Sequence, residues 1–309
     1  MEKIYDMIIV GGGPGGYTAA LYGARAGLSV LLIERLSPGG QMNLTEKIDN
    51  YPGFPEGIDG FELSMRMQQG AERFGAQTHY GEVLKVELED SVKVIHTDSG
   101  VFYGKTVVIS TGANPRPLGV EGEWELIGKG LGYCAHCDGM FYKGKTVVIV
   151  GGGNSAAAEA LYLSRIAKEV ILIHRRDSLR ATQIYHKPLM EAPNVRFLWN
   201  SRVKELRHAD VLSGVVVEDV HSGEEQYVPC QGLFVSIGRQ PATELVKEQL
   251  TLDAAGYIMA GEDTKTNLPG VFAVGDVRTK QLRQVVTAVA DGAMAAHMAE
   301  SYLSEGENI

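Results

Sequence analysis

Cysteine is scarce in this sequence, since its 309 residues include only Cys134, Cys137 and Cys230. Three cysteines are too few for a fold held together by disulfides, and a close pair in a chain that is not secreted indicates redox or metal chemistry. No apolar run approaches the roughly 20 residues that a membrane-spanning helix needs. Residues 1–10 end in a short apolar run without a small-residue cleavage site, unlike a signal peptide. We therefore expect a cytoplasmic protein without membrane contact.

Positive charge is in deficit, with 29 lysines and arginines against 38 aspartates and glutamates and a formal net charge of −9. This balance argues against a nucleic-acid partner, because such binding depends on neutralising phosphates with Lys and Arg. The length is generous for one domain and suits two. The 38 glycines and the hydrophobic fraction of 44% indicate an α/β protein with many tight turns between strands and helices.

An internal repeat is the strongest signal of organisation. Residues 5–35 and 145–175 each read as an apolar strand, a glycine turn, an alanine-rich helix and a second apolar strand. The pattern is a βαβ unit with parallel strands. Two copies predict two Rossmann-like dinucleotide-binding domains.

A late apolar segment indicates how the two domains are connected. Residues 266–276 predict a strand that ends in Gly275-Asp276, with a helix following from about Arg283-Gln284-Val285. No glycine-rich turn precedes this strand, so we expect it to complete a sheet that begins far upstream. The second domain is then inserted into the first. The expected bounds are residues 1–117 and 245–309 for the first domain and 118–244 for the inserted one.

The first glycine turn has the full pattern of a dinucleotide site, with Gly11, Gly13 and Gly16 between a strand and a helix. The glycines permit a tight turn, a close approach of a pyrophosphate to the backbone, and close packing of helix on strand. Glu34 ends the second strand, where a carboxylate hydrogen bonds to a ribose hydroxyl. The first site therefore suits an adenosine without a 2′-phosphate.

The second glycine turn differs at the position of the acid. Gly151 and Gly153 are followed by Ala156, an allowed third residue, but His174 stands where the first site has Glu34. Three arginines follow His174, namely Arg175, Arg176 and Arg180. A guanidinium group pairs with a 2′-phosphate, whereas a carboxylate repels it. The second site therefore favours NADPH, with a solvated charge run as the alternative.

The motif Cys134-Ala135-His136-Cys137-Asp138 is the predicted chemical centre. Two cysteines at this spacing can close a reducible disulfide suited to thiol–disulfide exchange. A zinc site is the weaker alternative, because four ligands are needed and only Cys230 and His136 remain as further candidates. Attachment of a c-type haem requires histidine at position 138.

The motifs resemble, in order and spacing, those of the low-molecular-weight thioredoxin reductases, which are class II pyridine nucleotide-disulfide oxidoreductases. The matching motifs are Gly11–Gly16, Pro38–Gln41, Cys134–Gly139, Gly151–Ala156, His174–Arg176 with Arg180-Ala181, Gly275–Val277 and Arg283-Gln284. As in that family, the cysteine pair stands just before the second glycine turn, inside the NADPH domain. The resemblance covers nearly the whole chain.

The resemblance implies a mechanism and a set of roles. NADPH reduces FAD, FAD reduces the Cys134–Cys137 disulfide, and the dithiol reduces thioredoxin or a thioredoxin-like protein. Cys137 is the flavin-proximal cysteine, Cys134 attacks the substrate disulfide, and Asp138 is the general acid/base. The NADPH domain rotates between the two half-reactions, and the enzyme is a homodimer.

The resemblance also implies the cofactor ligands. The residues implied for FAD are Gly11, Gly13, Pro14, Gly16, Glu34, Arg35, Gly40, Gln41, Asn50, Val83, Thr111, Gly112, Asp276, Arg283, Gln284 and Val285. Those implied for NADPH are Gly151, Gly153, Asn154, Ser155, His174, Arg175, Arg176 and Arg180. No metal is expected.

Two positions depart from the family pattern. His136 stands where the family usually has a small or hydroxylated residue, and an imidazole there either stabilises a thiolate or is a spacer. Ala158 replaces a frequent glutamate, which affects how NADPH is positioned. Cys230 is expected to be a buried structural cysteine.

Other functions account for fewer of these motifs. A flavin disulfide reductase for another partner, a glutaredoxin-like or a peroxiredoxin system, is an alternative, but a reductase that feeds a peroxiredoxin usually carries an extra N-terminal thioredoxin-like module. A ferredoxin-driven reductase does not need Arg175, Arg176 and Arg180, and a ferredoxin–NADP reductase-like enzyme does not need the cysteine pair. An NADPH sensor leaves both the pair and the late strand without a purpose.

Overall fold

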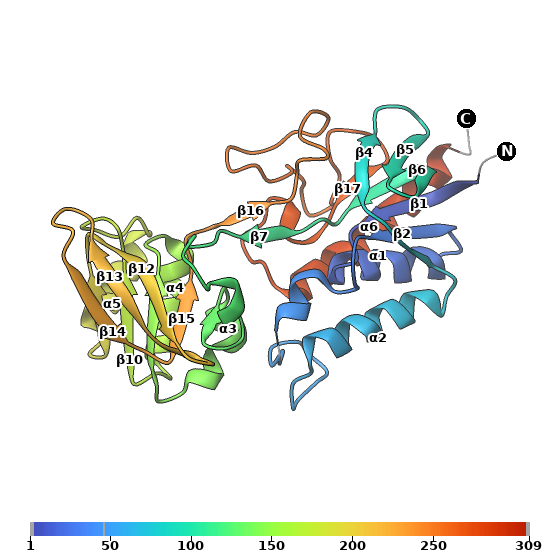
Figure 1. Ribbon diagram of the computed structural model, residues 1–309. Coiled ribbons are helices and arrows are strands. Elements are labelled where there is room, and N and C mark those ends of the chain that lie inside the picture. The colour runs from blue at the N-terminus through green and yellow to red at the C-terminus, as the bar shows by residue number, and fades with distance from the viewer. Residues whose placement is uncertain (1–2, 46, 307–309) are drawn as a thin grey trace. The chain divides into compact units, whose positions relative to one another are not determined.

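The computed structural model describes residues 3–45 and 47–306 (Figure 1). The contacts divide the chain into two compact units: unit 1 contains residues 1–114 and 240–309, and unit 2 contains residues 115–239. The second unit is therefore inserted in the first, as the sequence predicted. The chain passes between units a few residues before the expected positions at 117/118 and 244/245.

Unit 1 is built on a seven-stranded sheet in the order β3-β2-β1-β6-β5-β4, with β17 also paired to β6. Strands β1, β2, β3, β6 and β17 pair in parallel, whereas β4, β5 and the start of β6 pair antiparallel. The strands are β1 (Ile4–Val10), β2 (Val30–Glu34), β3 (Gln77–Tyr80), β4 (Val83–Glu87), β5 (Lys93–Thr97), β6 (Gly100–Ile109) and β17 (Val271–Ala273). The helices are α1 (Pro14–Arg25), η1 (Gly40–Leu44), α2 (Gly60–Glu72), η4 (Gly275–Val277) and α6 (Val285–Gly306).

The apolar strands of unit 1 form its core. The last four residues of β1, Met7–Val10, are buried, as expected for a parallel strand covered on both faces. Successive side chains of β1 enter two different apolar clusters. Ile8 and Val10 belong to one cluster, and Met7 and Ile9 belong to the other. Strand β17 completes this sheet, which confirms the expectation from the late apolar segment.

Unit 2 has a parallel sheet in the order β11-β10-β9-β15-β8. A separate antiparallel sheet, β12-β13-β14, was not predicted from the sequence. The strands are β8 (Leu131–Gly132), β9 (Thr146–Val150), β10 (Glu169–Ile173), β11 (Val195–Leu198), β12 (Ser201–His208), β13 (Leu212–Asp219), β14 (Glu225–Pro229) and β15 (Gly232–Val235). The helices are η2 (Trp124–Leu126), α3 (Ala135–Asp138), η3 (Gly139–Tyr142), α4 (Asn154–Ser164) and α5 (Gln183–Glu191).

The two segments that connect the units run beside each other. Strand β7 (Ala113–Pro115) pairs with β16 (Arg239–Pro241) in a two-stranded sheet. The Arg116 backbone N–H donates a hydrogen bond of 3.0 Å to the Gly238 carbonyl oxygen. Entry to and exit from unit 2 are therefore adjacent. Among the described residues, no helix is both long and apolar enough to cross a membrane.

Candidate cofactor sites and redox centre

The strand register of unit 1 brings several predicted residues to one edge of the sheet. Val10 is level with Ile33 on β2 and with Ile109 on β6, and Ile109 is level with Ala273 on β17. The residues just after these positions include Gly11, Glu34, Thr111 and Asp276. They lie at the carboxyl ends of the parallel strands, where ligands bind in this class of sheet.

The first glycine turn needs glycine for two different reasons. Gly11 has φ +104°, and a Cβ on it would lie 2.4 Å from the Ser110 carbonyl oxygen. A Cβ on Gly16 would lie 2.1 Å from the Gly11 carbonyl oxygen. A Cβ on Gly13 would meet nothing within 4 Å, so this glycine leaves open space in front of the helix. Helix α1 begins at Pro14 without a side-chain cap, and its free N–H groups suit an anion such as a pyrophosphate.

Glu34 is held against the first glycine turn. Its Oε2 accepts a hydrogen bond of 2.7 Å from the Gly12 backbone N–H, and its Oε1 accepts one of 3.1 Å from Leu36. Each carboxylate oxygen has further acceptor capacity, which leaves room for a ribose hydroxyl. The structure therefore brings this predicted acid to the turn it was expected to serve.

Other predicted FAD residues are joined across long stretches of sequence. The Asn50 amide donates to the Gln284 side chain at 2.9 Å, which ties the loop before α2 to the start of α6. A Cβ on Gly40 would lie 4.0 Å from the Gly13 Cα, so this residue lies close to the open turn. The Arg283 guanidinium lies 4.0 Å from the centre of the Tyr257 ring.

The remaining predicted residues of unit 1 have local partners. The Gln41 amide donates to Asn114 at 3.2 Å, and the Thr111 hydroxyl donates to the Ala242 carbonyl oxygen at 2.7 Å. Gly112 has φ +72°. Arg35 lies 3.7 Å from the carboxylate of Glu82, the residue before Val83.

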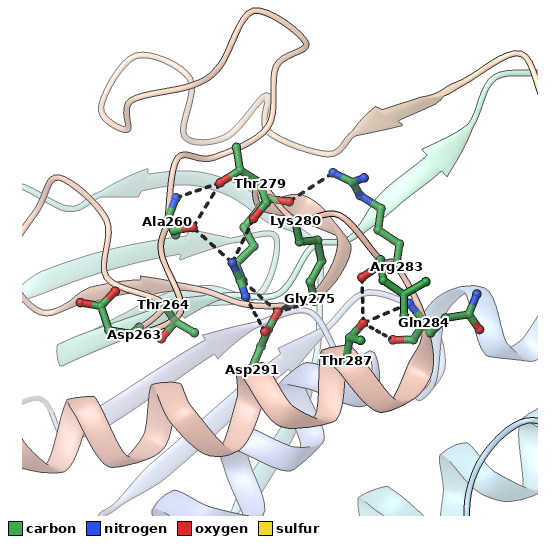
Figure 2. A network of polar contacts seen from close by, with 12 residues as sticks. Ala260, Asp263, Thr264, Gly275, Thr279, Lys280, Arg283, Gln284, Thr287 and Asp291 are labelled. Atoms are coloured by element: carbon green, nitrogen blue, oxygen red, sulfur yellow. Dashed lines mark hydrogen bonds and ion pairs between the residues drawn. The ribbon is translucent and has the colours of Figure 1, made fainter. Parts of the chain in front are cut away.

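A buried ionic network supports the segment that follows β17 (Figure 2). Asp291 on α6 accepts hydrogen bonds from the Gly275 backbone N–H at 2.8 Å and from Lys280 Nζ at 2.6 Å. It also accepts from Arg278 Nε at 2.9 Å and Nη2 at 2.6 Å. The side chains of Arg278, Lys280 and Asp291 are all about 10% exposed or less, at 10%, 7% and 8%. Asp291 thus fixes the loop that presents Asp276.

The charges in this network determine the ionisation of Asp291. Burial favours the neutral carboxyl, but the hydrogen bonds and charges of Arg278 and Lys280 outweigh it and hold the pKa of Asp291 below its usual value. Arg278, Lys280 and Asp291 were not predicted from the sequence. An acid in an otherwise apolar, alanine-rich helix was the signal that could have identified Asp291.

Unit 2 repeats the edge geometry of unit 1. Val150 is level with Ile173 on β10 and with Val235 on β15, so Gly151, His174 and Ser236 lie at one edge. A Cβ on Gly151 would lie 2.3 Å from the Ser236 carbonyl oxygen, whereas a Cβ on Gly153 would meet nothing within 4 Å. Helix α4 begins at Asn154 without a side-chain cap. The second turn therefore offers the same open approach to a helix N-terminus.

The arginine segment folds back onto this second turn. The Arg180 backbone N–H donates to the Gly152 carbonyl oxygen at 2.7 Å, and the Thr182 N–H donates to the Asn154 side chain at 2.8 Å. The side chains of Arg175, Arg176 and Arg180 are exposed, and the structure gives none of them an acidic partner among the described residues. Three cations without an acid beside a glycine turn suit a phosphate.

The His174 side chain packs against the second glycine turn. Its ring packs so closely on Gly152 that a Cβ there would lie 2.3 Å from the ring carbon Cε1. Burial lowers the pKa of His174, and the charges of Arg180, Arg176 and Arg175 lower it further. His174 is therefore neutral at pH 7, and its buried Nε2 has no hydrogen-bond partner among the described residues.

The cysteine pair forms a disulfide, as the sequence predicted. Cys134 and Cys137 are bonded, with their Cα atoms 5.3 Å apart. Cys134 is the residue before α3, and Cys137 lies within this one-turn helix. The third cysteine, Cys230, is buried, and burial raises the pKa of its thiol to about 12. It is therefore the inert, buried cysteine that the sequence indicated.

The surroundings of the disulfide favour proton transfer. Burial raises the pKa of Asp138 to about 6, so its carboxyl exchanges a proton near neutral pH. A Cβ on Gly132 would lie 3.1 Å from Asp138 Oδ2, so glycine at 132 leaves room for this carboxyl. The His136 ring packs on Tyr162 with ring centres 4.6 Å apart.

Two parallel-sheet units with open glycine turns, and a disulfide in one of them, define an oxidoreductase built on two dinucleotide-binding domains. The family described as pyridine nucleotide-disulphide oxidoreductase matches residues 5–292. Thioredoxin reductase from Listeria monocytogenes serovar 1/2a is 45% identical over 305 residues, covering 98% of this chain and 95% of its own. Thioredoxin reductase from Bacillus subtilis strain 168 is also 45% identical, covering 98% and 96%.

The solved structures point to the same group. A thioredoxin reductase from Streptococcus pyogenes MGAS5005 is 43% identical, with a TM-score of 0.91, and the match covers 99% of this chain and 100% of that one. The chain belongs to the pyridine nucleotide-disulphide oxidoreductase family and, within it, to the thioredoxin reductases. Membership implies a flavin and a nicotinamide cofactor, and the two open glycine turns fit two dinucleotides.

Proposed function

We propose that the protein is an NADPH-dependent thioredoxin reductase. The observation that carries this proposal is the Cys134–Cys137 disulfide, which lies in the same unit as the arginine-flanked glycine turn. The substrate is the disulfide of thioredoxin or of a thioredoxin-like protein. The names of the Listeria and Bacillus relatives support this choice of substrate.

The two glycine turns take different dinucleotides. In unit 1, the turn before α1 would hold the pyrophosphate of FAD, and Glu34 would hold its adenosine ribose. Asp276 and the start of α6, residues 283–285, would hold the flavin half. In unit 2, the turn before α4 would hold NADPH, and Arg175, Arg176 and Arg180 would pair with its 2′-phosphate. Together the two cofactors supply two electrons as a hydride equivalent.

The two cysteines carry these electrons to the substrate. Two electrons and two protons break the Cys134–Cys137 bond and leave two thiols. The Cys134 thiolate then attacks the substrate disulfide, forming a mixed disulfide and releasing one substrate thiol. Cys137 attacks the sulfur of Cys134, which restores the intramolecular disulfide and releases the second substrate thiol. By this assignment, Cys137 would be the cysteine nearer the flavin.

Asp138 holds the proton that this exchange requires. It follows Cys137 directly, and the pKa of its carboxyl, raised by burial to about 6, lets it donate and accept a proton near neutral pH. In Asp138→Asn we expect slower transfer from reduced flavin to the disulfide and unchanged cofactor binding, because only the proton is affected.

The insertion of unit 2 through two adjacent segments permits a rotation. The nicotinamide and the disulfide both belong to unit 2, and both have to reach the flavin of unit 1. We propose that unit 2 rotates on β7 and β16 to present them in turn. A homodimer is the proposed assembly.

Stopped-flow absorbance of the flavin tests the proposal. The protein is mixed first with NADPH and then with oxidised thioredoxin. In Cys134→Ser and Cys137→Ser, NADPH should still reduce the flavin, whereas turnover of thioredoxin should be lost, because one thiol cannot close the intramolecular disulfide. Cys137→Ser should also trap thioredoxin as a mixed disulfide through Cys134. Cys230→Ala is the matched control and should turn over normally.

The same experiment can reject the proposal. Full thioredoxin turnover in either serine variant would favour a cysteine-independent ferredoxin–NADP reductase. Normal NADPH oxidation without thioredoxin reduction in the native protein would favour another disulfide partner, such as a glutaredoxin-like protein or a peroxiredoxin system.

A further inference from the structure

A buried carboxylate joins the segment that enters unit 2 to the residue before the redox disulfide. Glu123 is only 1% exposed. Its Oε1 accepts hydrogen bonds from the Leu118 backbone N–H at 2.8 Å and from the Tyr133 hydroxyl at 2.6 Å. Its Oε2 accepts a hydrogen bond of 2.9 Å from the Gly119 backbone N–H. All three partners donate, so the arrangement suits the ionised carboxylate.

Burying the charge of Glu123 is costly, because its donors are all neutral. Among the described residues, no lysine or arginine pairs with it. Burial and the neighbouring carboxylate raise the pKa of Tyr133, so its hydroxyl stays protonated and remains a donor at neutral pH. Neither the cofactor sites nor the proposed exchange steps use Glu123. Its three hydrogen bonds therefore indicate that it holds its partners together.

Two of the three donors belong to the start of unit 2. Leu118 and Gly119 follow β7, which ends at Pro115. The Glu123 backbone N–H also donates to the Val120 carbonyl oxygen at 3.4 Å, and Gly119 has φ +78°. The carboxylate therefore closes residues 118–123 into a compact loop directly after the connecting segment.

The third donor is next to the redox disulfide. Tyr133 is the only residue between the end of β8 at Gly132 and Cys134, the N-cap of α3. Strand β8 pairs with β15 through Leu131 and Gly132, so the sheet supports the chain as far as Gly132. The Tyr133 side chain is half-buried and packs against the same apolar cluster as Leu118. Its bond to Glu123 therefore fixes the chain immediately before Cys134.

We propose that Glu123 is a positioning residue for Cys134, which acts through Tyr133 and fixes the disulfide to the segment that connects unit 2. This inference deepens the proposed function and rests on it. When unit 2 rotates, residues 118–123 and Cys134 then move as one body, so that the disulfide reaches the flavin in a fixed orientation. The proposed NADPH site lies at a different turn, before α4, and does not depend on this bond.

The equilibrium of the disulfide with glutathione tests the inference without NADPH or thioredoxin. Two glutathione thiols reduce the Cys134–Cys137 bond to a dithiol and form one glutathione disulfide. Without the Tyr133 hydroxyl, Cys134 is held less firmly, and its effective concentration at Cys137 falls. In the Tyr133→Phe holoenzyme, the ratio of disulfide to dithiol should therefore be about threefold lower than in the native protein. Anaerobic equilibration, alkylation and mass spectrometry measure this ratio.

Stopped-flow absorbance separates the two half-reactions. In Tyr133→Phe and in Glu123→Gln, reduction of the flavin by NADPH should be unchanged, whereas transfer from reduced flavin to the disulfide should be about tenfold slower. The double variant should have a disulfide ratio no lower than that of the more affected single variant, because both changes break the same bond. Tyr227→Phe is the matched control. It removes a tyrosine hydroxyl of the same unit, which donates to the Ser213 carbonyl oxygen at 3.0 Å, and should change neither measurement.

Three results would overturn the inference: an unchanged disulfide ratio in Tyr133→Phe, an equal shift in Tyr227→Phe, or equal slowing of both half-reactions. A lower melting temperature with an unchanged ratio would assign Glu123 to stability alone. If Glu123→Gln does not fold, Tyr133→Phe decides, since it removes a single hydroxyl group. A shifted ratio in a protein that fails to reduce thioredoxin would reject the proposed substrate and leave the role of Glu123 standing.

Discussion

Asp291 is the residue on which the loop after β17 depends. Four donor groups from Gly275, Arg278 and Lys280 converge on its two oxygens. The Asp291 side chain is buried, so water has little access to replace these donors. Buried ion pairs of this kind contribute less than their geometry suggests when intact, but removing one partner leaves uncompensated buried charge.

We therefore predict that Asp291→Asn lowers the free energy of unfolding of unit 1 by about 3–5 kcal/mol and reduces its FAD content. Thermal melts followed by flavin fluorescence measure both effects. Glu62→Gln is the matched control, because it breaks an exposed pair with Arg66 that contributes about 1 kcal/mol or less. A melt of Asp291→Asn equal to that of the control would contradict the structural role.

The difference in stability between the native protein and Asp291→Asn should also depend on pH. The pKa of Asp291 is lowered in the folded protein, so its contribution is fully present above the ordinary pKa of an aspartate and is lost as the pH falls through the lowered value. The stability difference between native protein and Asp291→Asn should be constant around pH 7 and shrink below about pH 4.

Among the elements, the two strand–turn–helix segments show why similar glycines have different functions. Gly16 is needed because the turn backbone leaves no room for a side chain, whereas Gly13 faces open space. We assign Gly16 to the packing of the fold and Gly13 to the approach of the proposed ligand.

We predict that Gly13→Val leaves the apoprotein folded but strongly reduces its affinity for FAD, since the new side chain occupies the approach to α1. Gly16→Val should instead destabilise unit 1 itself, because its Cβ would overlap the Gly11 carbonyl oxygen. Circular dichroism and flavin content of the purified variants measure the two effects. Undiminished flavin in Gly13→Val would reject the assignment of this turn.

The segment after β10 should control the choice of nicotinamide cofactor. We predict that replacing Arg175 and Arg176 with Ala weakens binding of NADPH far more than binding of NADH. Each lost charge-assisted hydrogen bond costs about 1.5–3 kcal/mol, or roughly one to two decades in affinity. Calorimetric titration with both cofactors measures this, with the exposed Arg196→Ala on β11 as a control. A native protein that already prefers NADH would contradict the assignment.

Contacts between residues that are close in the sequence could be predicted, whereas contacts between residues that are far apart in the sequence could not. Gly11, Glu34, Cys134 and Cys137 were found because each is defined by a short pattern with a fixed spacing. The Asn50–Gln284 and Arg278–Asp291 contacts were not found, because only the packing of α6 brings them together.

At the scale of the whole molecule, each unit has apolar clusters made from its own residues. Unit 2 enters and leaves through segments joined by the Arg116–Gly238 hydrogen bond, so its two ends are close together. Such a unit satisfies the requirements for folding independently.

We predict that residues 115–239 fold when expressed alone, form the Cys134–Cys137 disulfide and bind NADPH but not FAD. The remaining chain, with residues 116–238 replaced by a short Gly-Ser linker, should bind FAD but not NADPH. Circular dichroism and calorimetric titration of both fragments measure this. An unfolded 115–239 fragment, or FAD binding by it, would contradict the division of sites between the units.

The pairing of β17 with β6 has a consequence for how the protein is made. All of unit 2 lies between these two strands in the sequence, so the ribosome completes it before β17 and α6 emerge. During that interval Val107–Ile109 of β6 lack the strand that covers them, which leaves an apolar sheet edge open to aggregation. The FAD site that we propose at the carboxyl ends of the parallel strands likewise lacks Asp276 until the segment after β17 has been synthesised. We therefore expect the proposed FAD site to become complete only after unit 2 and β17 have both been synthesised.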